Sequence, residues 1–235
     1  MADGLAHFLH KPVMRHLMNI TYMDSYIETF ETWNKIASVY EGQFMGLDLY
    51  NETYDYLCNT IIKEEASILD VGCGPGNITK YLLSKRPDFQ INGIDIAPNM
   101  VRLAKSNNPT ASFHIMDSRH ISELKTKYEG IICGFCLPYL SEADCTKLIY
   151  DTHGLLSDTG FLYLSFVEGN QKDSGFKVGS TGDRMYFYYH NLNFIKAQLI
   201  ENEFNVLETF HIEYVKTETF KETHTIVIAK KKTTA

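Results

Sequence analysis

Apolar positions in the first quarter of the chain recur every three or four residues. One stripe runs from Ile27 to Tyr40, and a second covers residues 49–62. This spacing places apolar side chains on one helix face and predicts helices over residues 21–64. A short apolar run at residues 67–71 ends in glycines, which is typical of a strand buried in a parallel sheet.

Strand-like and helix-like segments alternate along most of the remaining chain. Strands are predicted at residues 91–96, 112–116, 129–134 and 160–167, with helices at about 76–85, 98–106, 141–155 and 191–202. This alternation predicts an α/β fold with a doubly wound parallel sheet. In the tail, Asn205–Val215 and Thr223–Lys230 are two β-rich runs with no helix between them, so they predict an antiparallel C-terminal hairpin.

Residues 168–190 form a long connection before the last predicted helix. Glycine, serine and lysine are frequent in its first half, and it ends in the aromatic run Met185–His190. A connection of this length inside a compact domain is more often a functional lid than a plain linker. We therefore predict a lid insertion over residues 168–190.

The charge balance is acidic, with a formal net charge of −7 over 235 residues. A predominantly basic surface is therefore not expected, nor is a nucleic acid held through its phosphates. The five cysteines are odd in number and lie mostly in apolar runs, which indicates reduced thiols and a cytoplasmic location. The apolar runs are shorter than the ~20 residues of a membrane span, so no membrane partner is expected.

Residues 1–18 look unlike the rest of the chain and are interpreted as a leader or a disordered N-terminus. The histidines in this segment are left out of any metal site, and no metal is predicted. Residues 19–235 then form a single domain. Within it we expect a helical cap at 19–64 and a core at 65–235 that carries the lid insertion.

Three glycines alternate in the loop that follows the first predicted strand, Asp70-Val71-Gly72-Cys73-Gly74-Pro75-Gly76-Asn77. Glycine lets backbone groups approach a ligand closely, because it has no Cβ. A dinucleotide-binding loop would place its third glycine at position 77, which is Asn77 here. Asp70 is also a poor neighbour for a phosphate, and it suits a ligand with a positive amino group.

Two further acids end the next two predicted strands, Asp95 the second and Asp117 the third. A carboxylate at the tip of the second strand can accept hydrogen bonds from both ribose hydroxyls. Asp117 can accept one from an exocyclic adenine amine. Open α/β sheets bind ligands at the carboxyl ends of their strands, so the three acids predict a site for an adenosine ligand.

These motifs resemble the class I S-adenosylmethionine-dependent methyltransferases of the small-molecule branch, over roughly residues 33–230. The strongest element is Ile68–Gly76, and Gly93–Met100 is similar to the second family motif. Ala97 departs from that motif, since the family often has a helix-capping serine there. The resemblance implies a Rossmann-like methyltransferase fold with a seven-stranded sheet and N-terminal cap helices. It also implies S-adenosylmethionine as cofactor and S-adenosylhomocysteine as its product.

The resemblance also implies which residues hold the cofactor. Asp70 and Gly72 would serve the methionine part, Asp95 the ribose, and Asp117 the adenine edge, while Tyr40 would close over the cofactor. The full implied set is Tyr40, Asp70, Gly72, Gly74, Gly76, Asp95, Ile96, Met100, Met116, Asp117, Ser118, Gly134 and Phe135.

No side chain stands out as a catalytic base, and His190 and Tyr40 are only weak candidates. His190 is either a general base or a residue at a helix entry. The run Met185–His190 is either the start of a helix packed on the sheet or a wall of the acceptor pocket. Cys133 and Cys136 have no second pair with which to form a zinc site.

The sequence thus predicts an enzyme that transfers a methyl group to a small-molecule acceptor by in-line displacement. We expect it to act as a monomer or homodimer. A protein or RNA methyltransferase and a non-catalytic S-adenosylmethionine-binding regulator remain as alternatives. The acceptor atom, whether O, N, C or S, stays open.

Overall fold

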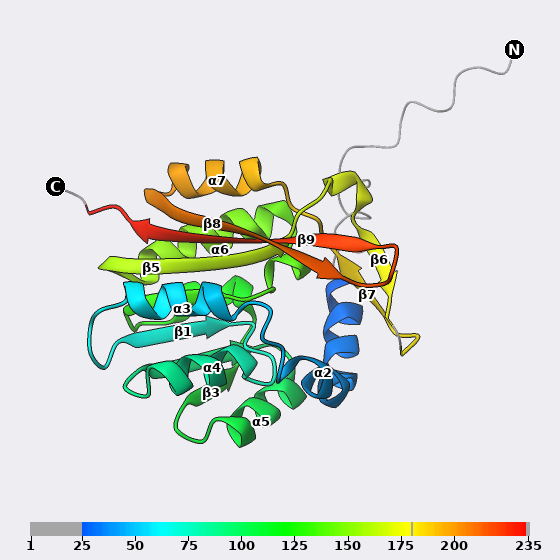
Figure 1. Ribbon diagram of the computed structural model, residues 1–235, viewed down its shortest axis with the longest axis horizontal. Helices are drawn as coiled ribbons and strands as arrows, with labels where there is room; N and C mark the ends of the chain where they lie inside the picture. The colour runs from blue at the N-terminus through cyan, green and yellow to red at the C-terminus, as the bar shows by residue number, and fades with distance from the viewer. Residues whose placement is uncertain (1–24, 180, 234–235) are drawn as a thin grey trace, which may run out of the picture.

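A seven-stranded sheet forms the centre of the computed structural model, which describes residues 25–179 and 181–233 (Figure 1). Its strands are β1 (Ser67–Val71), β2 (Gln90–Asp95), β3 (Ser112–Ile115), β4 (Tyr128–Cys133), β5 (Leu156–Val167), β8 (Phe204–Val215) and β9 (Lys221–Lys231). Their order is β3–β2–β1–β4–β5–β9–β8. The first five strands run parallel, and β9 is antiparallel to both of its neighbours. The predicted doubly wound sheet and its C-terminal hairpin are confirmed.

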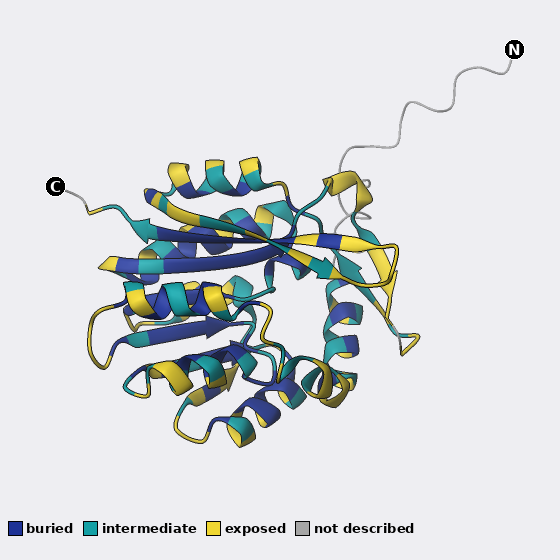
Figure 2. Ribbon diagram, viewed as in Figure 1, coloured by how far each residue is buried: buried dark blue, intermediate teal, exposed yellow. Residues whose placement is uncertain are grey.

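Helices cover both faces of this sheet. They are α3 (Asn51–Thr60), α4 (Asn77–Lys85), α5 (Pro98–Asn107), α6 (Glu142–Leu155) and α7 (Leu192–Glu201), whereas α2 (Ala37–Phe44) lies beyond the carboxyl ends of the strands (Figure 1). Leu69 and Val71 of β1 pack with residues of α6 and α7, whereas Ile68 packs with residues of α3 and α4. Alternate side chains of a strand point to opposite faces, so the central strands are buried on both sides (Figure 2).

Helix α3 belongs to this layered core and not to a cap. Its Tyr54 is buried in the cluster between α3, α4 and the sheet. Its Thr53 hydroxyl lies 2.9 Å from the Tyr163 hydroxyl of β5. Of the cap expected over residues 19–64, the helix at residues 25–35 and α2 stand beside the carboxyl ends of the strands (Figure 1). An amphipathic pattern fits either position, so the sequence could not separate α3 from the cap.

The connection at residues 168–190 contains a small second sheet, formed by β6 (Gly175–Val178) and the antiparallel β7 (Arg184–Phe187). The run that ends at His190 is therefore largely extended and does not begin a helix, since α7 starts only at Leu192. The side chain of Asn191 caps α7 by accepting a hydrogen bond from the backbone N–H of Asn193.

The β6–β7 hairpin is bonded to the helix at residues 25–35. The Thr32 hydroxyl donates to the carbonyl of Arg184 at 2.7 Å, and the backbone N–H of Tyr186 donates to the Thr29 hydroxyl at 2.9 Å. Lys35 pairs with Asp183 in addition. The helix and the hairpin thus form one continuous cover beside the carboxyl edge of the sheet.

None of the helices within residues 25–179 and 181–233 is both long enough and apolar enough to cross a membrane. Residues 1–18, interpreted above as a leader, lie outside the described residues.

Candidate functional site

The alternating glycines of the loop after β1 all have left-handed backbone conformations. The φ angles are +68° at Gly72, +53° at Gly74 and +81° at Gly76, a region that residues with a Cβ rarely adopt. A Cβ on Gly72 would also lie 2.8 Å from the Cβ of Cys136. Gly76 is the N-cap residue of α4, and its carbonyl accepts a hydrogen bond from the Asn108 side chain.

Asp70 lies beneath this loop and is fully buried. Its Oδ2 accepts a hydrogen bond of 2.7 Å from the Thr79 hydroxyl, and its Oδ1 has no partner. Burial, together with the nearby charge of Asp95, raises the pKa of Asp70 to about 6. An unpaired buried carboxylate oxygen is costly, so it fits a cationic group that bonds to it directly or through water.

A cavity of about 140 Å³, called the smaller cavity below, lies at the carboxyl edge of β1, β2 and β4. Every residue of the predicted cofactor set lines it except Asp70 and Gly76. These two lie just behind its wall, Asp70 in the core and Gly76 at the start of α4. The fold therefore brings together residues spread from Tyr40 to Phe135.

Asp95 holds the glycine loop as well as facing the smaller cavity. Its Oδ2 accepts from the backbone N–H of Gly74 at 2.9 Å, and its Oδ1 accepts from that of Ala97 at 2.8 Å. Burial raises the pKa of Asp95 despite these two bonds. Each carboxylate oxygen can accept more than one hydrogen bond, so Asp95 can still receive two hydroxyl groups.

Asp117 is engaged by Arg119, whose guanidinium and backbone N–H both bond to the carboxylate. Burial alone would raise the pKa of Asp117, but Arg119 outweighs burial and lowers it. The same guanidinium stacks on the ring of Tyr26, 4.0 Å from its centroid. Sequence reasoning missed Arg119 and Tyr26, because nothing in the short motif at Asp117 indicates this pairing.

Aromatic residues of the cap close the smaller cavity. Trp33 makes edge-on contacts with Tyr40 and Tyr139, at centroid distances of 5.3 and 5.2 Å. The ring of Tyr40 lies across the loop, 3.7 Å from where a Cβ on Gly74 would stand. Helix α2 thus reaches the glycine loop through Tyr40.

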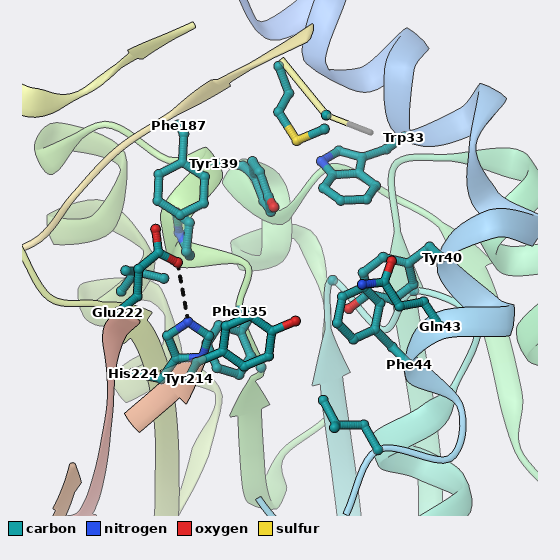
Figure 3. A pocket seen from close by; sticks show the side chains of 18 of the residues that line it. Trp33, Tyr40, Gln43, Phe44, Phe135, Tyr139, Phe187, Tyr214, Glu222 and His224 are labelled. Carbon is teal, nitrogen blue, oxygen red and sulfur yellow. Dashed lines mark ion pairs between the residues drawn. The ribbon is translucent and has the colours of Figure 1, made fainter. Parts of the chain in front are cut away.

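A larger cavity of about 640 Å³ adjoins the first one (Figure 3). The two share Trp33, Tyr40, Gly134, Phe135 and Tyr139 among their lining residues. Aromatic side chains from α2, the β6–β7 segment and the β8–β9 hairpin form part of the remaining wall, among them Phe44, Phe187, Tyr189, Tyr214 and Phe220. Its volume is within the range of small-molecule sites, about 300–1,000 Å³.

The wall of the larger cavity also contains a polar cluster centred on Glu222 and His224 of β9. Nδ1 of His224 lies 2.7 Å from the Tyr50 hydroxyl, and its Nε2 lies 3.7 Å from Oε2 of Glu222. Glu222 also accepts a hydrogen bond from Lys216 at 2.7 Å. Burial would raise the pKa of Glu222, but His224 and Lys216 outweigh it and lower that pKa. Sequence reasoning missed this cluster, because Glu222 and His224 look like ordinary positions of an alternating strand.

His190 and His224 lie in different surroundings. His190 lines neither cavity; its Nε2 lies 2.8 Å from the carbonyl of Leu137, and burial lowers its pKa. His224 lines the larger cavity next to Phe135, with ring centroids 4.9 Å apart. Phe135 has a φ of +55° and donates its backbone N–H to Ser165, so strained backbone forms part of the shared wall.

Comparison with known proteins adds independent information. A family model described as a methyltransferase domain matches residues 68–160. The malonyl-[acyl-carrier protein] O-methyltransferase of Acetivibrio thermocellus is 32% identical over 134 residues, which cover 52% of this chain and 47% of that protein. The putative methyltransferase 235L of Invertebrate iridescent virus 6 is 30% identical over 121 residues, covering 52% and 44%. The chain spans about half the length of these curated relatives.

Solved structures share the fold. The magnesium protoporphyrin IX methyltransferase of Synechocystis PCC 6803, solved with bound S-adenosylmethionine, has a TM-score of 0.58 at 20% identity. The alignment covers 78% of this chain and 80% of that one. The matched family domain begins in β1 and ends in β5, so it includes the glycine loop, Asp95 and Asp117. Residues 68–160 are therefore similar to a methyltransferase domain, and the chain shares the fold of S-adenosylmethionine-dependent methyltransferases.

Proposed function

We propose that this chain transfers a methyl group from S-adenosylmethionine to a small-molecule acceptor. The observation that carries the proposal is the junction of the two cavities at Tyr40, Gly134 and Phe135. One cavity is built from the predicted cofactor residues, and the other has room for an acceptor. Bound S-adenosylmethionine supplies a methyl group already activated on a sulfonium. The chain has mainly to align an acceptor atom with that methyl group and to exclude water.

In this proposal, different residues around the smaller cavity bind different parts of the cofactor. The unpaired Oδ1 of Asp70 attracts the amino group of the methionine part. Asp95 accepts hydrogen bonds from the ribose hydroxyls, and Met116, Asp117 and Ser118 contact the adenine. Tyr40 covers the cofactor from the cap side.

The walls of the larger cavity support a small acceptor. Parts of the cap, the β6–β7 hairpin and the β8–β9 hairpin line it, and a recess of this kind suits a small molecule better than the surface of a folded macromolecule. Relatives are named for small or carrier-bound acceptors, such as the trans-aconitate 2-methyltransferase of Methylobacterium nodulans. A non-catalytic regulator would need no acceptor cavity. A cytoplasmic location and a monomeric or homodimeric state stay predictions.

Two measurements test the proposal in sequence. Calorimetry should detect binding of S-adenosylmethionine and S-adenosylhomocysteine, but no comparable binding of NAD. The chain, supplied with methyl-labelled S-adenosylmethionine, should then label a low-molecular-weight product in a metabolite pool. Tight cofactor binding with label only in protein or RNA would contradict the small-molecule acceptor, and binding without any transfer would favour the regulator.

A further inference from the structure

The sheet topology places His224 on the wall of the larger cavity, called the acceptor cavity from here on because the proposed function assigns it to the acceptor. His224 is the partner of Val167, the last residue of β5, in the antiparallel β5–β9 pair. Because β9 runs antiparallel to β5, it begins beside the end of β5. The start of β9 therefore lies at the edge of the sheet where the parallel strands have their carboxyl ends. The His224 ring is held there between Tyr214, stacked at a centroid distance of 4.7 Å, and Phe135.

One nitrogen of this ring is bonded and the other is not. Nδ1 lies 2.7 Å from the Tyr50 hydroxyl, whereas Nε2 is buried without a hydrogen-bond partner. His224 is 7% exposed and Glu222 8% exposed. A buried polar atom without a partner is uncommon in a folded protein. Since Nε2 belongs to a residue on the cavity wall, a bound ligand can supply the missing partner.

We propose that His224 is the proton acceptor for a hydroxyl group on a planar aromatic acceptor, with Tyr50 and Glu222 as positioning residues. This inference rests on the proposed methyltransferase function. The competent tautomer has its proton on Nδ1, donated to the Tyr50 oxygen, and a lone pair on Nε2. Oε2 of Glu222 lies 3.7 Å from Nε2, so its negative charge stabilises the protonated, positively charged form of the His224 ring.

The step balances with the methyl donor of the proposed function. The acceptor oxygen forms a bond to the methyl carbon, whose bond to sulfur breaks with the electron pair left on sulfur. The proton of the acceptor hydroxyl passes to Nε2 of His224. The positive charge therefore moves from the sulfonium to the imidazolium, where the Glu222 carboxylate stabilises it.

The chemistry of the wall favours a planar ring over a free carboxylic acid. Trp33, Tyr139 and Phe187 face the cavity from the side opposite Phe44 (Figure 3), and flat aromatic faces pack well on aromatic ligands. Lys177 and Lys216 are the only cations among the described lining residues. Lys216 is paired with Glu222, and Lys177 donates to the carbonyl of Asp173. Lys177 is therefore the one cation among the described lining residues whose charge is not paired with a carboxylate.

The test compares phenols of different acidity as acceptors for the wild type and for His224→Gln. A phenol that stays protonated at the assay pH needs a base, so its kcat should fall about 100- to 10,000-fold in the variant. A substituted phenol that is already ionised at that pH needs none, and its kcat should fall less than tenfold. Equal losses for both phenols, or no loss for either, would overturn the assignment of His224 as a base.

Further variants separate chemistry from folding. His211→Gln is the matched control, because His211 lies on β8, bonds to Thr225 and lines neither cavity; its activity should equal that of the wild type. Tyr50→Phe keeps the ring but loses the hydroxyl, so kcat for the protonated phenol should fall while KM changes little. Calorimetry with S-adenosylhomocysteine should give the same Kd for all four proteins.

The outcome also distinguishes this inference from the proposed function. Methyl transfer to amines or carboxylic acids, with none to any phenol, overturns the inference and leaves the methyltransferase intact. Absence of both cofactor binding and methyl transfer in the wild type overturns the proposed function and, with it, the inference.

Discussion

At the scale of single residues, the raised pKa of Asp70 leads to a prediction about the pH dependence of cofactor binding. Its pKa rises from an ordinary value of 3.8 to about 6 through burial. Because the folded chain binds this proton more tightly than the unfolded chain, Asp70 contributes most stability at low pH. That contribution is lost as the pH rises from about 4 to about 6 and amounts to at most about 3 kcal/mol. Ionised Asp70 is then available to a cationic ligand group.

We therefore expect the affinity for S-adenosylhomocysteine to increase with pH and to level off above about 6. Below that value Kd should weaken by up to about tenfold per pH unit, since one proton must leave. Calorimetry between pH 5 and 8 measures this slope. Asp70→Asn should flatten it, and Asp151→Asn, a buried aspartate of α6 that lines neither cavity, should not. An equal slope in Asp70→Asn would contradict the prediction.

Asp95→Ala should weaken the apo protein as well as cofactor binding. Two backbone N–H groups, of Gly74 and Ala97, lose their acceptor, at about 1–3 kcal/mol for each that stays buried and unpaired. Loss of two ribose contacts should raise the cofactor Kd about a hundredfold or more. Urea unfolding and calorimetry measure the two effects separately. Asp158→Ala, at an exposed position of β5, is the control and should change neither.

At the scale of elements, the helix at residues 25–35, called the cap helix below, supplies the N-terminal side-chain hydrogen bond that α5 lacks within its own sequence. Ala97 provides no side-chain bond at the start of α5, as the departure from the family motif led us to expect. Oδ1 of Asn34 instead accepts from the backbone N–H of Asn99 at 2.9 Å, and the Asn99 side chain donates to the Asn34 carbonyl. Two distant segments thus share one helix terminus.

Asn34→Ala should therefore cost about 0.5–2 kcal/mol of stability, the usual effect of losing a helix cap. It should also loosen the cap helix, with a weaker affinity for S-adenosylhomocysteine. Asn193→Ala, in an exposed position of α7, should stay within about 0.5 kcal/mol. Denaturant unfolding measures the free energy of unfolding of both variants. A loss in Asn34→Ala no greater than that in Asn193→Ala would show that the Asn34–Asn99 contact does not stabilise α5.

The cap helix and the β6–β7 hairpin should respond to the cofactor together, because Thr29, Thr32 and Lys35 tie them to each other. Lid elements are drawn from the less stable part of a fold. Hydrogen exchange should therefore slow in residues 25–44 and in the hairpin on adding S-adenosylhomocysteine. Equal protection in both states, together with full activity of Tyr40→Ala, would mean that the cap is only scaffold.

At the scale of the whole molecule, much of the fold followed from patterns that are local in the sequence. The central strands read as continuous apolar runs because both of their faces are buried. Pro98 and the glycine loop set where helices begin, since proline and left-handed glycine act on the backbone at their own positions. Most of the cofactor residues that the family resemblance implies meet in one cavity.

The sequence by itself determined the sheet, the glycine loop and the acids at the strand tips, because each depends on residues that are neighbours in the chain. Only the tertiary structure decided that α3 joins the core, that the 168–190 segment forms a hairpin, and that His224 rather than His190 lines the larger cavity. These outcomes depend on partners far away in the sequence. Tyr50, Phe135 and Tyr214 surround His224, and no periodicity along β9 carries that information.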